Sequence, residues 1–174
     1  MRGEVTVEKL WRFIEALGNA AKGPGRVYLT GAATALIEGW RTMSVDLDLK
    51  LDPEPPGVFE AIARLKDELD ISIELAAPDD FVPALPGWQD RSRFVATHGP
   101  VSFYEYDPYG QILAKIARGH DRDQLDVRQY LERGLVEPAK FRELYAQIVP
   151  QLIRYPRIDQ AILEKRIDRA LARP

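Results

Sequence analysis

The sequence predicts an α/β (α+β) protein. Strands and helices alternate through residues 1–106, and helices alone follow in residues 107–174. Two patterns carry this prediction. Apolar residues recur every three or four positions from Val5 to Ala21, which is typical of an amphipathic helix. From Asp46 to Leu51, charged and apolar residues alternate one by one, as they do in a half-buried strand. A chain of 174 residues fits one domain with a helical extension.

The other elements follow from residues that end or begin regular structure. We expect a strand at 27–29 and a short helix at 32–37 that ends at Gly39. A second amphipathic helix spans 58–69, with Phe59 and Ala63 among its inward-facing residues, and a strand follows at 71–75. A hairpin is expected at 91–106, and Asp107 is expected to cap a helix that breaks near Gly119. Two further helices are expected at 138–148 and 157–172.

Composition excludes several classes of protein. The net charge of −3 is not that of a nucleic-acid polycation, and the absence of cysteine excludes disulfides and Cys-based zinc sites. The first residues, MRGEVTVEKLWRF, do not resemble a signal peptide, and no apolar stretch reaches the roughly 20 residues of a membrane helix. We therefore expect a cytoplasmic protein that does not enter a membrane.

The strand that begins at Asp46 carries the strongest chemical signal. Asp46 and Asp48 lie two residues apart, so both carboxylates point to one face, about 6–7 Å apart along the strand. The alternate residues, from Val45 to Leu51, are expected to cover a core. A divalent cation such as Mg²⁺ or Mn²⁺ would remove the repulsion between the carboxylates. The alternative is that the pair lies on the wet face of an ordinary half-buried sheet.

Residues before and after this pair could complete a site. Glu74 lies on the polar face of a later strand, and three carboxylates would converge if that strand were adjacent. Gly31 joins a strand to a helix, a turn that can hold a phosphate or simply close the chain. Arg41 and Ser44 could contact a phosphate or face solvent. Asp79 and Asp80 are weaker acidic candidates because Pro78 places them in a turn.

The helical part adds one basic and two acidic candidates. Lys115 lies within an apolar helix segment, so it either reaches solvent or turns toward buried carboxylates. Asp123 and Asp126 are spaced to share one helix face. They could belong to a site or to a salt-bridged helix surface.

Two stretches together resemble a known family. YLTGAATALIEGWRTMSVDLDLKL resembles the core motif of the nucleotidyltransferase fold, and ILAKIARGHDRDQLDVRQYLERGLV resembles its Lys and Arg-Asp helix. The resemblance is to the minimal and AbiEii-like proteins of bacterial toxin–antitoxin systems and covers roughly 27–136. It implies a nucleotidyltransferase-like mixed sheet flanked by helices. One departure is that Thr30 replaces the first glycine of the family's usual pair, or Ala32 the second.

The resemblance also implies roles for individual residues. Asp46 and Asp48 would bind Mg²⁺ or Mn²⁺, with Glu74 as a third metal ligand or as the base. Nucleotide-binding residues would be Thr30, Gly31, Arg41, Ser44, Lys115 and Asp126. The chain would transfer NMP from an NTP to a hydroxyl of RNA (tRNA included) or protein, within a toxin–antitoxin or abortive-infection system. The alternative, which the altered glycine pair motivates, is an inactive partner of a cognate toxin or antitoxin.

Overall fold

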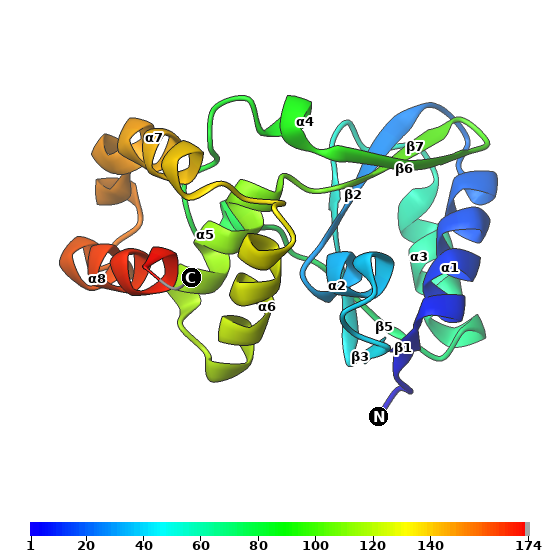
Figure 1. Ribbon diagram of the computed structural model, residues 1–174. Helices are drawn as coiled ribbons and strands as arrows, with labels where there is room; N and C mark the ends of the chain where they lie inside the picture. Colours follow the sequence, from blue (N-terminus) through cyan, green and yellow to red (C-terminus); the bar gives the residue numbers. More distant parts are fainter. Residues whose placement is uncertain (173–174) are drawn as a thin grey trace. The chain divides into compact units, whose positions relative to one another are not determined.

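The computed structural model describes residues 1–172, and the chain divides into two units (Figure 1). The first unit comprises Met1–Ala77 and Ser92–Tyr106, and the second comprises Pro78–Arg91 and the chain from Asp107 onward. The segment Pro78–Arg91 therefore belongs with the helical part, although it precedes two strands of the sheet. The last two residues of the expected helical part, 173–174, lie outside the described residues.

A five-stranded mixed sheet forms the centre of the first unit, in the order β5-β4-β2-β7-β6. β2 pairs antiparallel with β4 and parallel with β7, β4 pairs parallel with β5, and β6 and β7 form the expected hairpin. This topology confirms the predicted mixed α/β fold. The strands are β2 (Gly25–Thr30), β4 (Asp46–Leu51), β5 (Ser72–Leu75), β6 (Arg93–His98) and β7 (Val101–Glu105).

Three helices belong to this unit: α1 (Val7–Ala20), α2 (Ala32–Glu38) and α3 (Val58–Glu68). α1 and α3 lie side by side (Figure 1) and share one hydrophobic core with the sheet. The alternate residues Leu47 and Leu49 of β4 point into this core and are fully buried. Asp46 and Asp48, which alternate with these leucines along the strand, therefore point to the other face of the sheet.

The prediction of the core is wrong for Val45, Phe59 and Ala63, which were expected to face it and are exposed. Val45 is 73% exposed because it lies in a bend between β3 and β4, where no ladder imposes the alternation of the strand. Phe59 is 49% exposed, because the buried face of α3 starts at Val58 and continues through 61, 62 and 65 at helical spacing. A small sheet of β1 (Val5–Thr6) and β3 (Met43–Ser44) was also not predicted.

The second unit is helical, as predicted, and its helix ends follow the sequence signals. Asp107 caps α5, since its carboxylate accepts a hydrogen bond of 3.0 Å from the Tyr109 N–H, and Gly119 ends that helix in the left-handed conformation. Arg91 forms an ion pair of 2.7 Å with the buried Asp107. The helices are η1 (Pro78–Asp80), α4 (Trp88–Arg91), α5 (Pro108–Arg118), α6 (Asp121–Glu132), α7 (Pro138–Ile148), η2 (Val149–Arg154) and α8 (Gln160–Leu171). Within residues 1–172, no helix has the length and apolar character needed to cross a membrane.

Candidate active site

Three carboxylates converge on the face of the sheet opposite the core. Asp46 and Asp48 come from β4 and Glu74 from β5, and the parallel register of the two strands pairs Asp48 with Glu74. One oxygen from each carboxylate lies within 4.8 Å of the other two. The sequence alone did not establish that β5 lies beside β4, and the structure supplies that adjacency.

The donor set of this cluster fits a hard divalent cation. All three groups offer carboxylate oxygens. Hard cations such as Mg²⁺ and Mn²⁺ prefer oxygen ligands of this kind, whereas softer metals prefer nitrogen or sulfur ligands. Mg²⁺ binds oxygen at about 2.0–2.1 Å, so ligands of one ion lie about 3–4 Å apart, and small side-chain rotations would close the cluster to that size. Asp46 and Asp48 are half-buried and Glu74 is exposed, so solvent and substrate can reach the cluster.

A glycine turn lies against one of these carboxylates. Gly31 follows β2 and precedes α2, and its backbone has φ 61° and ψ −129°, a region that is open essentially only to glycine. A Cβ atom at this position would lie 2.5 Å from Oδ2 of Asp48. The turn therefore needs glycine for two independent reasons, the backbone conformation and the approach of Asp48.

The other residues expected near this turn have defined partners. The Thr30 hydroxyl donates a hydrogen bond of 2.9 Å to the carbonyl of Ala76, which ties the end of β2 to the chain after β5. Ser44 is buried in β3, where it pairs with Val5. Arg41 is half-buried, and its backbone N–H donates a hydrogen bond to the carbonyl of Ala35 in α2. Their expected contacts with a nucleotide stay predictions.

Comparison with known proteins gives the family. Residues 7–154, which are most of the chain and include every candidate site residue, match a family model described as a nucleotidyltransferase of unknown function, DUF6036. The chain belongs to this nucleotidyltransferase family. Searches of curated proteins and of solved structures returned no match. Membership confirms the nucleotidyltransferase part of the resemblance and implies an NTP substrate.

The second unit of this nucleotidyltransferase-family chain holds a buried ion network. The Lys115 ammonium lies 2.8 Å from Oδ2 of Asp126 and 3.6 Å from Oδ1 of Asp123. Arg118 donates two hydrogen bonds, of 2.7 and 2.6 Å, to the carboxylate of Asp123. Both aspartates are only 2% exposed, so they form a salt-bridged interior and not the salt-bridged helix surface that was the alternative.

The charges of this network balance. Burial raises the pKa of Asp123, but the hydrogen bond from Arg118 and the charge of Lys115 outweigh burial and hold that pKa below its ordinary value. Sequence reasoning left open that Lys115 turns toward buried carboxylates, which the structure confirms, but it did not identify Asp123 as the partner of Arg118. The i, i+3 spacing of the aspartates was the available signal, and it indicated a shared helix face without indicating burial. The role of Lys115 toward a triphosphate stays a prediction.

Proposed function

We propose that this protein transfers a nucleoside monophosphate from an NTP to a hydroxyl group of RNA, tRNA included, or of a protein. The carboxylate cluster beside the Gly31 turn, in a chain of a nucleotidyltransferase family, is the observation that supports this function most directly. In the reaction, the acceptor oxygen bonds to the α-phosphorus and the α–β anhydride bond breaks. Pyrophosphate leaves, and the hydroxyl proton passes to a carboxylate or to solvent.

Each part of the site has a task in this proposal. Asp46, Asp48 and Glu74 would hold Mg²⁺ or Mn²⁺, which when bound neutralises phosphate charge and orients the reacting groups. Glu74 is the most exposed of the three, which suits it to receive the proton of the attacking hydroxyl. Gly31 allows backbone to approach the phosphates closely, because it has no side chain.

The cellular setting that we propose is a cytoplasmic toxin–antitoxin or abortive-infection system of the AbiEii-like type. A second candidate function is an inactive partner of a toxin or antitoxin that keeps the fold. The hydrogen bond that commits the Thr30 hydroxyl to Ala76 favours this alternative, because that hydroxyl is then not available to a phosphate. The two candidates differ in whether NTP binds.

Thermal unfolding with each of the four NTPs, with and without Mg²⁺ or Mn²⁺, tests the proposal. A ligand that binds only the folded protein raises the unfolding midpoint by mass action. We expect one NTP to raise the midpoint only when metal is present, and we expect Asp46→Asn/Asp48→Asn to abolish this effect. The same NTP, labelled on its α-phosphate, should then transfer label to RNA or protein.

A matched control distinguishes the effect of removing the metal ligands from the effect of removing two negative charges. Glu54→Gln/Glu60→Gln removes two carboxylates from exposed positions of the same unit and should leave the NTP effect intact. Equal stabilisation of the aspartate variant and the wild type would refute the proposed site. The absence of any NTP effect, together with stable co-purification of a second protein, would favour the inactive partner.

A further inference from the structure

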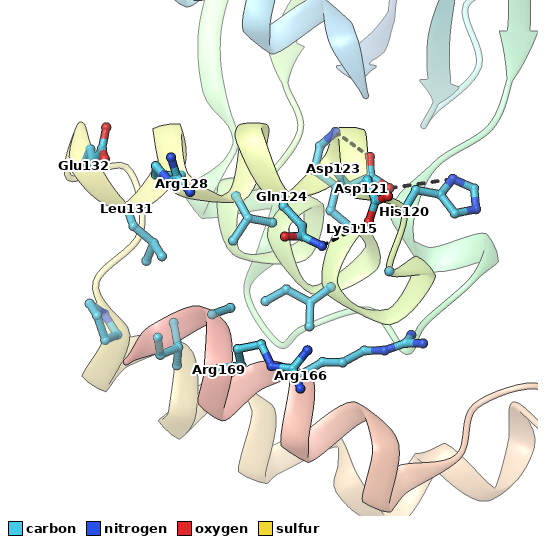
Figure 2. A pocket seen from close by; sticks show the side chains of 16 residues that line it. Lys115, His120, Asp121, Asp123, Gln124, Arg128, Leu131, Glu132, Arg166 and Arg169 are labelled. Atoms are coloured by element: carbon cyan, nitrogen blue, oxygen red, sulfur yellow. Dashed lines mark hydrogen bonds and ion pairs between the residues drawn. The ribbon is translucent and has the colours of Figure 1, made fainter. Parts of the chain in front are cut away.

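A pocket of about 460 Å³ lies within the helical unit, between α6 and α8 (Figure 2). The end of α5 and the first residue of α7 complete its lining. None of Asp46, Asp48 and Glu74 contributes to it, so an inference from this pocket does not depend on the proposed transfer reaction. Its volume lies within the range of about 300–1,000 Å³ that is usual for small-molecule sites.

Two helix faces supply most of the lining at regular spacing. α6 contributes Gln124, Val127, Arg128 and Leu131, an i, i+3, i+4, i+7 pattern that places all four on one face. α8 contributes Arg166, Arg169 and Ala170 by the same rule. Figure 2 shows the arginines of α8 extending along the pocket, and the Gln124 side-chain amide on α6 donates a hydrogen bond of 3.4 Å to Asp121. The pocket therefore lies between one face of α6 and one face of α8.

The lining combines apolar and cationic side chains in a way that selects a class of ligand. Ile116, Val127, Leu131 and Leu171 form an apolar wall. A flat apolar ring could pack against such a wall. An apolar wall alone fits many ligands, so the charged residues of the lining determine which class of ligand the pocket binds.

Two charged residues of the lining, Lys115 and Asp123, are held in ion pairs. Lys115 is neutralised by Asp126, and Asp123 is neutralised by Arg118. This pairing removes one cation and one anion of the lining from any account of ligand binding.

Apart from the paired Lys115 and Asp123, the lining contains three arginines and two carboxylates. Within residues 1–172, neither Arg128 nor Arg169 has a carboxylate within ion-pair distance, whereas Arg166 donates a 2.7 Å hydrogen bond to the carbonyl of Ala117. That bond fixes Arg166 at the end of α5. The opposing carboxylates of the lining are Asp121 and Glu132. A pocket lining in which arginines outnumber carboxylates favours a ligand with a phosphate group.

We propose that this pocket binds a small organic phosphate of about the size of a nucleoside monophosphate. Arg128 and Arg169 bind its phosphate, and its ring packs on the wall of Val127 and Leu131. Gln124 also belongs to the lining; its amide nitrogen donates to Asp121, and its Oε1 atom would accept a hydrogen bond from the edge of the ring. The pocket needs no metal ion, because arginines neutralise the phosphate directly.

Calorimetric titration of the full chain in EDTA tests this proposal. The probes are AMP, GMP, CMP and UMP, the four matching nucleosides and inorganic phosphate. We expect at least one monophosphate to bind more tightly than both its nucleoside and inorganic phosphate. Arg128→Gln/Arg169→Gln should weaken that binding tenfold or more, whereas Arg154→Gln/Arg157→Gln, which removes two exposed arginines outside the lining, should not.

Two further measurements keep the outcomes separate. Asp46→Asn/Asp48→Asn should bind the monophosphate as the wild type does, so the pocket can be confirmed even if nucleotidyl transfer is never observed. Arginine Nε NMR signals of the wild type should shift for Arg128 and Arg169 when the monophosphate is added. Binding that survives in the Arg128/Arg169 variant, or is lost in the Asp46/Asp48 variant, would overturn the assignment. Failure of all four monophosphates to bind more tightly than inorganic phosphate would also overturn it.

Discussion

The carboxyl group of Glu105 gives the sharpest prediction for the stability of the protein. Glu105 ends β7 with a side chain that is only 4% exposed, and among the described residues its Oε1 atom has no hydrogen-bond partner. Its other oxygen lies 3.7 Å from Nη1 of Arg93, which itself lies 2.6 Å from Glu38. Burial and then the charge of Glu38 raise the pKa of Glu105 to about 7, although Arg93 and Thr34 act in the opposite direction.

The sign and size of the effect follow from this pKa. In the unfolded chain the carboxyl has its ordinary pKa of 4.5, so between these values only the folded state binds the proton. The protonated carboxyl therefore favours the folded state fully below pH 4.5, and this stabilisation is lost as the pH rises to about 7. A gap of about 2.5 between the pKa values, at about 1.4 kcal/mol for each tenfold step, gives about 3–4 kcal/mol.

Glu105→Gln keeps the shape of the protonated side chain and cannot ionise. We expect the variant to match the wild type near pH 4.5 and to exceed its free energy of unfolding by up to about 3–4 kcal/mol above pH 8. Urea unfolding of both proteins at the two pH values measures this difference. Glu60→Gln, the same substitution at an exposed site, is the control. An equal effect of Glu105→Gln at both pH values would refute the assignment of a raised pKa to this group.

Two further variants test the glycine turn and the buried network. Gly31→Ala should destabilise the protein by about 1 kcal/mol or more and weaken Mn²⁺ binding, because the added Cβ meets Asp48. Gly39 also has a positive φ, 85°, but has open space around it. Gly39→Ala should therefore lower stability in urea unfolding without weakening Mn²⁺ binding. Lys115→Met should cost about 3–5 kcal/mol by leaving Asp126 buried without its 2.8 Å partner. The double variant Lys115→Met/Asp126→Leu should recover part of that loss, and a double variant no more stable than the single one would contradict this explanation.

Local signals in the sequence predicted the regular elements well. The alternation from Asp46 to Leu51 identified β4, because one face of that strand has to be apolar to cover the core. Gly39 and Gly119 end α2 and α5 in the left-handed conformation, where glycine has no steric penalty. Asp107 marks the start of α5 because its carboxylate satisfies a free backbone N–H group.

Features that depend on tertiary contacts were not predictable. The β1–β3 sheet has two residues in each strand, too few for a periodic pattern to emerge. Burial of Asp123 could not be inferred from its charge, because an unpaired buried carboxylate is costly and its partner Arg118 belongs to the preceding helix. Strand adjacency, which brings Glu74 to Asp48, requires long-range pairing that no local window contains.

The alternation of apolar and charged residues in β4 and β5 nevertheless positions both the core and the candidate active site. In β5, buried Ile73 precedes Glu74, so the strand can bury its apolar face only if Glu74 points away from the core. A register shift of one residue against β4 would place Ile73 opposite Asp48 and turn Glu74 toward the apolar layer. The burial of Ile73 and Leu49 therefore excludes that shift and holds the third carboxylate beside the first two. Substitutions in the core that loosen this register should weaken metal binding without touching a metal ligand.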